Sequence, residues 1–236
     1  MRIRCFLILM LLGSWLLNGE CATQRDFQVW PNLTAIGRFS HSDNTAFGRL
    51  RCWLEGQERI GDDSKRLTQT LLRPGLGYAV TPSLSLWLGY AWIHTNRPLT
   101  SSPFNENRIW QQLLWIKTTP HFTFTSRTRM EQRFFQNDPN NNKVAYRARQ
   151  LMKIAIPLKY NSRLSAVGSD EVFWHKNNYI GRNGRGFDQN RLFVGLGYKI
   201  NSNATTEIGY MNQYIRRYGV PNFLSNIVSI NFFLNF

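Results

Sequence analysis

The sequence has little cysteine, and this excludes several classes of protein. Three cysteines occur among 236 residues. Cys5 and Cys21 fall in an N-terminal segment that we expect to be removed, so Cys52 remains as a single thiol that cannot form an internal disulfide. The chain is therefore not a disulfide-stabilised secreted mini-domain. Because it also lacks CxxC and His/Cys spacings, we predict no metal site and no cofactor.

Acidic residues are also scarce. The chain has 14 Asp and Glu against 29 Lys and Arg, which gives a formal net charge of +15. In a cytosolic protein such a balance would indicate nucleic acid as the partner. An exported protein meets other anions, such as lipopolysaccharide, phospholipid head groups, acidic sugars and phosphate. We expect partners of this second kind and no nucleic acid.

The N-terminal segment indicates export. Arg2 and Arg4 precede an apolar run from Cys5 to Leu17, and small and polar residues follow it. The run is short for a membrane span and has the layout of a secretory signal peptide. We predict a cleaved signal peptide at residues 1–21 and a single barrel domain at 22–236.

After residue 24 no segment is apolar for long enough to form a membrane helix. Segments of roughly ten residues instead alternate apolar and polar side chains between turns, which is typical of a transmembrane β-barrel. The clearest segments are 46–58, 84–94, 122–135, 144–159 and 191–200. In the last of these, Leu192, Val194 and Leu196 share one parity, whereas Arg191 and Lys199 share the other.

The connections between these segments alternate in length. Short links fall at 81–83, 118–120, 161–162 and 201–203, and longer polar links at 94–108, 136–143, 176–190 and 216–222. Bacterial outer-membrane barrels have short periplasmic turns and longer extracellular loops. We therefore predict an all-β, antiparallel up-and-down transmembrane barrel in the bacterial outer membrane of a Gram-negative cell.

A soluble periplasmic sandwich or lipocalin-like barrel would also alternate, but with its apolar face inside. Two features favour the membrane barrel. Aromatic side chains on the apolar face, near the ends of the strands, resemble the aromatic girdles at membrane interfaces. They are Tyr90, Trp92, Trp110, Phe122, Phe124 and Tyr198. The chain also ends on the alternating segment NIVSINFFLNF. We expect this strand to pair back to the first strand, and its terminal Phe236 to be recognised by the barrel assembly machinery.

The number of strands is harder to predict than the fold class. Eleven segments can be counted, but single-chain bacterial barrels have an even number. Pro31 interrupts the segment 26–39, and proline is confined to edges and bulges of sheets. We therefore predict about twelve strands, with 26–39 divided into two, and ten as the alternative; a third arrangement threads the first segment back through the lumen.

Seven segments carry a resemblance to a known family. They are LRPGLGYAV (72–80), LWLGYAWIHT (86–95), MEQRFF (130–135), YRARQLMKIAIPL (146–158), DEVFWH (170–175), FDQNRLFVGLGYKI (187–200) and EIGYMNQY (207–214). Over nearly all of its mature length the chain resembles the bacterial outer-membrane family known as domain of unknown function 2490. The resemblance implies a location and a fold, and no particular activity.

Catalysis finds little support in the sequence. Barrel hydrolases of this compartment need a nucleophile and a base within hydrogen-bond reach, with the base oriented by a third group. The turn 41–44 (His-Ser-Asp-Asn) has suitable residue types but not the spacing of an outer-membrane phospholipase, and His175 shares its parity with Glu171. We predict no catalytic residues, and a membrane-embedded lipid hydrolase is the third functional reading.

If the apolar positions of each strand face lipid, the alternate positions, many of them basic, face the lumen. The predicted basic wall comprises Arg49, Arg51, Arg127, Arg129, Arg133, Arg147, Arg149, Lys153 and Arg191, and the predicted lumen acids are Glu55, Glu131, Glu171 and Glu207. The segments 122–135 and 144–159 should form a hairpin, which brings six of these bases onto one wall. Because like charges on neighbouring strands repel each other, the acids are expected to offset them.

Two main functions follow from such a lumen. Arg–Glu networks can brace a closed structural barrel, or an excess of basic side chains can leave a narrow channel for small anionic solutes, as rings of Arg or Lys do in anion pores. A barrel of about twelve strands has an intermediate bore, which allows either function. Basic loop residues could in addition bind the phosphates of lipopolysaccharide; these are Arg182, Arg185, Arg216 and Arg217.

Overall fold

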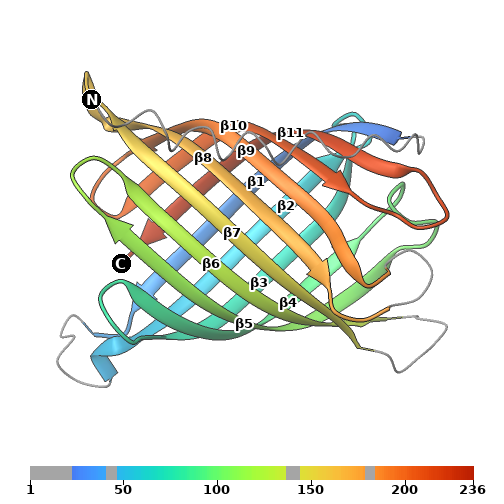
Figure 1. Cartoon of the computed structure of the whole chain (residues 1–236), viewed down its shortest axis with the longest axis horizontal. Coiled ribbons are helices and arrows are strands. Elements are labelled where there is room, and N and C mark those ends of the chain that lie inside the picture. The colour runs from blue at the N-terminus through green and yellow to red at the C-terminus, as the bar shows by residue number, and fades with distance from the viewer. Residues whose placement is uncertain (1–22, 41–46, 137–143, 179–183) are drawn as a thin grey trace.

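The computed structural model describes residues 23–40, 47–136, 144–178 and 184–236, so the predicted signal peptide at 1–21 lies outside the described residues. Within these ranges the chain forms eleven strands and one short 3-10 helix, closed into a barrel (Figure 1). The elements are β1 (Thr23–Arg38), η2 (Phe47–Arg49), β2 (Leu50–Gly61), β3 (Arg66–Ala79), β4 (Leu84–Thr95), β5 (Phe104–Thr118), β6 (Thr123–Phe135), β7 (Ala145–Leu158), β8 (Asn161–His175), β9 (Gly186–Lys199), β10 (Ala204–Ile215) and β11 (Asn222–Asn235). No helix in the described ranges is long and apolar enough to cross a membrane.

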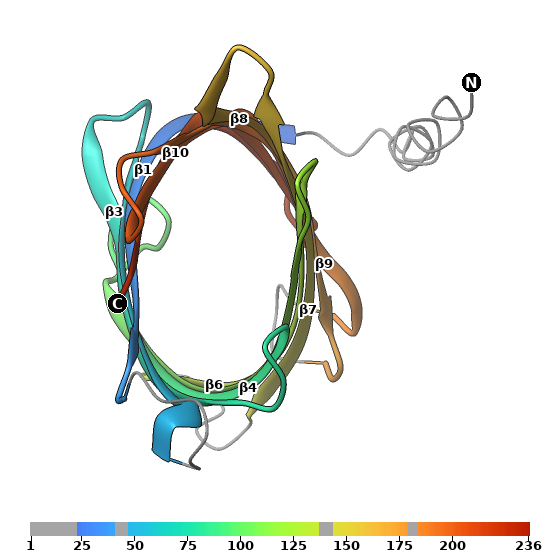
Figure 2. The same cartoon turned by 90° about the vertical axis from the view of Figure 1, so that its left-hand side faces the viewer.

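Each strand pairs antiparallel with the next along the chain, and β1 closes the barrel by pairing in parallel with β11. The parallel register runs from Thr23 opposite Asn222 to Ile36 opposite Asn235. Figure 2 views the barrel from one end and shows the strands as a continuous oval wall. The chain's C-terminal strand therefore pairs back to the first strand, as the sequence predicts.

The strand count among the described residues is eleven, and not the twelve or ten expected from the sequence. The segment that we expected to divide at Pro31 is the single strand β1, which lies in the wall and not in the lumen. On the β2 side the paired residues stop at Val29 and resume at Asn32, so the ladder is interrupted where proline cannot donate. On the other side β11 pairs with the whole stretch. With an odd number of strands the first and last run in the same direction, which makes the closure parallel.

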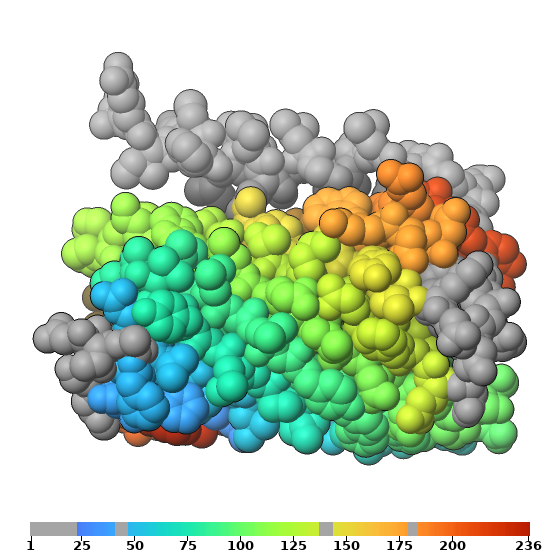
Figure 3. All heavy atoms as spheres, turned by 90° about the horizontal axis from the view of Figure 1, so that it is seen from below, coloured from blue at the N-terminus to red at the C-terminus, as the bar shows by residue number. Residues whose placement is uncertain are grey.

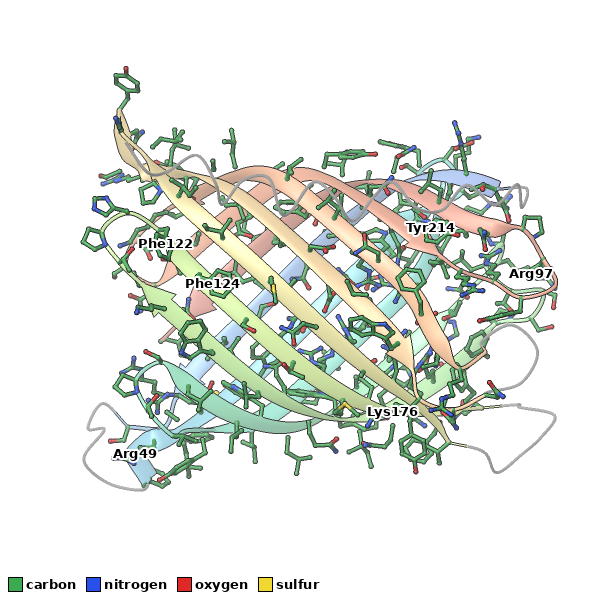
Figure 4. The ribbon with its side chains drawn as sticks, in the orientation of Figure 1. Arg49, Arg97, Phe122, Phe124, Lys176 and Tyr214 are labelled. Carbon is green, nitrogen blue, oxygen red and sulfur yellow. The ribbon has the colours of Figure 1, made fainter. Side chains whose placement is uncertain are left out.

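The two ends of the barrel differ in their connections. The links at 80–83, 119–122, 159–160 and 200–203 are short, whereas those at 96–103, 136–144, 176–185 and 216–221 are longer. Figure 4 shows Phe122 and Phe124 at the short-turn end, and Arg97, Lys176 and Tyr214 at the long-loop end. The connection between β2 and β3 is an exception, because it lies at the long-loop end and consists only of residues 62–65. Since β1 runs parallel to β11, the start of β1 also lies at the long-loop end.

The outer face of the wall is apolar and the inner face is largely polar. Leu88, Val194 and Leu196 are more than half exposed, whereas Arg129 and Glu131 on the opposite parity are buried. Figure 3 shows side chains packed over the outside of the wall from β3 to β7. The strands have 12 to 16 residues, longer than the roughly 9–11 that a tilted strand needs to cross a bilayer. These features confirm the predicted all-β, up-and-down barrel.

Part of the inner face is also apolar. Trp53, Trp87 and Trp110 point inward and pack edge to face into a cluster with Leu71 and Ile93. The prediction that Trp110 belongs to the outer aromatic girdle is therefore wrong, because its side chain is fully buried inside the barrel. Its indole N–H donates to the backbone carbonyl of Tyr90 at 3.0 Å, which satisfies its polar atom.

Pairs of glycines make room for these inward rings. Gly75 and Gly89 are partners across β3 and β4, and a Cβ added at Gly89 would lie 2.3 Å from the Trp110 ring. Gly195 and Gly209, partners across β9 and β10, lie beneath Phe193 in the same way. The rings therefore lie against the wall and leave the centre of the lumen open. Gly89 belongs to one LGY segment of the sequence, and Gly77, where an added Cβ would lie 2.4 Å from the Trp87 ring, belongs to another.

Candidate functional site

Two cavities lie end to end in the part of the lumen that the structure describes. The cavity toward the long loops has a volume of about 270 Å³ and is lined in part by Glu106 and Asp188. The cavity toward the short turns has a volume of about 430 Å³ and is lined in part by Lys153 and Glu207. The residues that line both cavities are Trp30, Arg59, Arg73, Arg149 and Arg191. We refer to the four arginines among them as the arginine layer.

The arginine layer draws its side chains from both sides of the barrel, because β2 and β3 supply Arg59 and Arg73, and β7 and β9 supply Arg149 and Arg191. Each has the inward parity of its strand, so the alternation of the sequence directs all four to the lumen. Trp30 of β1 lies among them, with the guanidinium groups of Arg59 and Arg191 4.0 and 5.1 Å from its ring centroid. Such cation–π contacts hold a guanidinium in place without neutralising its charge.

Arg59 is the least neutralised member of the arginine layer. Its Nη1 donates to Gln69 Oε1 at 2.6 Å, and its Nε donates to Gln57 Oε1 at 3.1 Å. Among the described residues its hydrogen-bond partners are thus neutral amides. Arg191 is intermediate, because its Nη1 lies 3.7 Å from Glu171 Oε2. The layer therefore carries positive charge that its own partners do not fully offset.

The other two members are paired directly with carboxylates. Arg73 Nη1 lies 2.5 Å from Glu55 Oε1. Arg149 bridges two acids, with Nη1 2.7 Å from Glu131 Oε1 and Nη2 2.8 Å from Glu171 Oε1. Charge-assisted hydrogen bonds of this length are strong and directional. These two arginines are accordingly held rigidly in the wall.

The predicted basic wall on β6 and β7 is present. The two strands form a hairpin in which Arg129 is opposite Arg149 and Glu131 is opposite Arg147. Repulsion between the facing arginines is relieved because Arg129 turns toward β5, where its Nε and Nη2 donate to Gln112 Oε1 at 2.9 and 2.6 Å. Arg147 Nη2 in turn lies 2.7 Å from Glu131 Oε2. The wall is a network of arginines held together by buried acids.

Most residues predicted for the lumen lie there. Inward-facing members are Arg51, Arg127, Arg129, Arg133, Arg147, Arg149, Lys153 and Arg191, together with the acids Glu55, Glu131, Glu171 and Glu207. Lys153 Nζ and Glu207 Oε1 are paired at 2.5 Å, and Arg127 Nη2 lies 2.8 Å from Glu171 Oε1. Arg51 lies apart from the network, because its Nη1 donates to the carbonyls of Gly48 and Leu50.

The prediction that Arg49 belongs to the basic wall of the lumen is wrong. It belongs to the 3-10 helix η2, and its side chain is exposed at the short-turn end (Figure 4). The alternating strand begins only at Leu50, so parity cannot be extended back to Arg49. Among the basic loop residues, Arg182 lies outside the described residues, whereas Arg216 and Arg217 follow β10 at the long-loop end.

Several lumen residues are absent from the set predicted from the sequence. Glu106 receives hydrogen bonds from both Arg108 and Arg133, with Nε–Oε1 distances of 2.5 and 2.6 Å. Asp188 lies 3.2 Å from Arg147 Nη1. The spacing of Glu106 and Arg108 by two residues gives them one parity, and this signal would have found them. Arg59 and Arg73 lie beside mixed or glycine-containing stretches, where the alternation is weak.

The lumen carries a surplus of positive charge among the described residues. Apart from Arg51 and Arg217, which lie at the two ends of the barrel, the described part of the lumen holds ten basic and six acidic side chains: Arg59, Arg73, Arg108, Arg127, Arg129, Arg133, Arg147, Arg149, Lys153 and Arg191, and Glu55, Glu106, Glu131, Glu171, Asp188 and Glu207. Such a surplus makes the electrostatic potential inside the lumen positive.

Comparison with known proteins gives the family. Residues 27–223 match the family of proteins of unknown function designated DUF2490. The chain belongs to the DUF2490 family. An uncharacterised protein of Methylorubrum extorquens is 33% identical over 214 residues, which cover 90% of this DUF2490 chain and 89% of that protein. A solved structure of the NanC porin is similar with a TM-score of 0.47 and 14% identity, covering 82% of this chain and 90% of that one.

Of the two histidine sites considered in the sequence of this DUF2490 chain, His175 belongs to the described residues. His175 is buried in the lumen, with its Nε2 3.3 Å from Asp188 Oδ2. Glu171, its suggested partner, is engaged by Arg127 and Arg149. The turn at 41–44 lies outside the described residues. Within the described ranges no group of three or more His, Cys, Asp or Glu side chains could hold a metal ion.

Proposed function

We propose that this DUF2490 protein is a bacterial outer-membrane barrel that forms a narrow channel with a preference for small anionic solutes. The observation that carries the proposal is the arginine layer, whose four guanidinium groups line the cavities on both sides. A solute that moves from one cavity to the other must pass these groups. Rings of basic side chains are how pores select anions over cations.

The membrane location is supported by the apolar exterior of the barrel. The outer parity presents Leu, Val and aromatic side chains, which would be unfavourable in water and suit a lipid environment. In this location the short turns face the periplasm and the long loops face outside. The outer leaflet then brings lipopolysaccharide phosphates within reach of Arg216 and Arg217, and the strand ending at Phe236 is available to the assembly machinery in the newly exported chain.

The channel is best tested in planar bilayers with variants that change charge without breaking the wall. Arg59 and Arg191 are the suitable positions, because Arg73 and Arg149 bind carboxylates at 2.5–2.8 Å and their loss would break buried ion pairs. Arg59→Gln and Arg191→Gln remove one charge each from the arginine layer. Arg163→Gln removes the same charge from an exposed position at the short-turn end and is the matched control.

We expect the wild-type protein to conduct with chloride preferred over potassium. The Arg59→Gln, Arg191→Gln double variant should lose most of that preference, whereas Arg163→Gln should retain it. Absence of conductance in repeated reconstitutions of correctly folded protein contradicts the proposal. So does a double variant that keeps the full chloride preference.

A second function, a closed structural barrel, is favoured by the buried Arg–Glu network. Glu131 is 1% exposed and lies within ion-pair distance of Arg108, Arg147 and Arg149, which tie β5, β6 and β7 together. Such a network rigidifies a wall whether or not solutes pass beside it. The bilayer recording separates the two functions, since a purely structural barrel stays silent.

A further inference from the structure

The larger cavity has a mixed lining that a channel for inorganic ions does not require. On one side Trp53 of β2 and Leu114 and Ile116 of β5 present apolar surface to it, and Phe193 and Met211 do so from β9 and β10. Trp53 is held by edge-to-face contact with Trp87, with ring centroids 5.4 Å apart. The apolar surface is thus fixed in place and continuous with the inner tryptophan cluster.

Cationic groups lie directly beside this apolar surface. Arg127 of β6 is the cross-strand partner of Leu114, and both line the cavity. Arg73 lines the same cavity from β3. Each guanidinium uses one Nη to bind a carboxylate, Glu171 or Glu55 respectively, at 2.8 and 2.5 Å.

Both arginines retain a hydrogen-bond donor that is not used. The Nε–H groups of Arg73 and Arg127 are buried and have no acceptor among the described residues. The Arg73 side chain is 4% exposed, and both arginines line the larger cavity. A buried donor without an acceptor costs free energy, which an incoming anionic oxygen would recover. This observation points to an anionic group of a ligand near these arginines.

We infer that the larger cavity binds a small organic anion, a carboxylate that carries an aromatic or aliphatic body. The carboxylate lies at Arg73 and Arg127, and the apolar body lies against Trp53, Leu114 and Ile116. The cavity volume of about 430 Å³ is within the range of small-molecule sites. The inference deepens the proposed function and rests on it, because it names the solute class for the short-turn half of the same lumen.

The test uses three matched probes and the full-length mature barrel refolded in detergent. 3-Phenylpropionate has both the charge and the apolar body, propionate lacks the body, and 3-phenylpropionamide lacks the charge. Isothermal titration calorimetry measures the affinity of each probe without requiring conductance. We expect 3-phenylpropionate to bind about tenfold or more tightly than either of the others, since each loses one of two contributions.

Two variants locate the binding, each with a matched control. Ile116→Thr reduces the apolar surface in the cavity, and Ile109→Thr makes the same change on the outward face of the same strand. Arg127→Gln removes the charge while Arg149 still binds Glu171, and Arg163→Gln removes an exposed charge. Heat-modifiable migration in gels verifies that each variant is folded. We expect both cavity variants to weaken 3-phenylpropionate binding severalfold and both controls to leave it unchanged.

The outcomes separate this inference from the channel proposal. Equal binding of propionate or of 3-phenylpropionamide overturns the inference, and so does an effect of the control variants that equals that of the cavity variants. Absence of 3-phenylpropionate binding by folded protein overturns it as well. If that protein still conducts with anion preference, the channel proposal stands alone; if the probe binds and no current flows, the binding site stands without the channel.

Discussion

Glu131 is the residue on which the inner wall most depends. Its carboxylate receives hydrogen bonds from Arg147 at 2.7 Å and from Arg149 at 2.7 Å, and its side chain is almost fully buried. Removal of one partner from a buried ionic network leaves the remaining charges buried and unpaired. The resulting loss of stability is larger than that caused by replacing the whole network with apolar residues. A buried acid such as Glu131 is therefore expected to contribute strongly to the free energy of unfolding of this barrel.

Glu131→Gln should lower the free energy of unfolding by about 3–5 kcal/mol, the range for breaking a buried pair from one side. Urea unfolding followed by tryptophan fluorescence in detergent or vesicles measures the change. The control is Asp63→Asn, which removes a 3.8 Å ion pair with Lys65 between exposed side chains and should change the free energy of unfolding by about 0–1 kcal/mol. A Glu131 variant as stable as the control would show that the network does not brace the wall.

At this scale the sequence predicted most of the lumen correctly, because parity along a strand is a local property. Arg129, Arg147 and Arg149 alternate with apolar residues and could be assigned to the inner face from spacing alone. Arg73 could not, because the inward positions that follow it are Gly75 and Gly77, which present no side chain to reveal the alternation. Which arginines line both cavities depends on contacts between distant strands, and no local pattern contains that information.

At the scale of elements, β3, β4 and β5 are shaped by the contact between Trp110 and a glycine pair. A Cβ at Gly89 would lie 2.3 Å from the Trp110 ring and 2.4 Å from the backbone carbonyl of Pro74. The second contact is with backbone, which cannot move aside without disturbing the β3–β4 ladder. Glycine at this position therefore reflects close packing inside the barrel.

Gly89→Ala should destabilise the barrel by about 1–3 kcal/mol, as overpacking does in well-packed interiors. Gly56→Ala is the matched control, because a Cβ at Gly56 has no atom within 4 Å and the change should be nearly neutral. Thermal unfolding monitored by heat-modifiable gel migration compares the two. Equal melting temperatures for both variants would contradict the packing described for Trp110.

The sequence could not place Trp110 correctly for a related reason. Its neighbours Ile109 and Gln111 share one parity and Arg108 and Gln112 share the other, so the strand has a polar residue on each face. Because aromatic residues form girdles on the lipid-facing surface of membrane barrels, the sequence then favours the lipid side for Trp110. The glycine pair that receives the ring lies on β3 and β4, more than twenty residues away at Gly89, and the contact is visible only in the folded structure.

At the scale of the whole molecule, the parallel pairing of β1 with β11 determines how the barrel closes. The β1 residue Leu33 is the partner of Phe232 on β11, and both side chains face outward. A barrel with an even number of strands would instead close with an antiparallel pair. The number of strands is a property of the complete ring, so Pro31, which suggested a division from local sequence, was a poor guide to it.

This closure predicts a specific cross-link. In a Cys52→Ser background, Leu33→Cys with Phe232→Cys should form a disulfide under mild oxidation, because adjacent strands lie about 4.8 Å apart. Leu33→Cys with Val228→Cys is the matched control, since Val228 also belongs to β11 but pairs with Val29. Mass spectrometry of the digested protein identifies the linked peptides. A stronger link in the control pair would refute the register.

The most direct test of the central claim is the zero-current potential of the wild-type protein in a planar bilayer with a KCl gradient. A lumen in which basic side chains outnumber acidic ones among the described residues, with an arginine layer between its two cavities, should pass chloride more readily than potassium. We expect a zero-current potential whose sign corresponds to chloride preference. A potential of the opposite sign, or folded protein that never conducts, would contradict it.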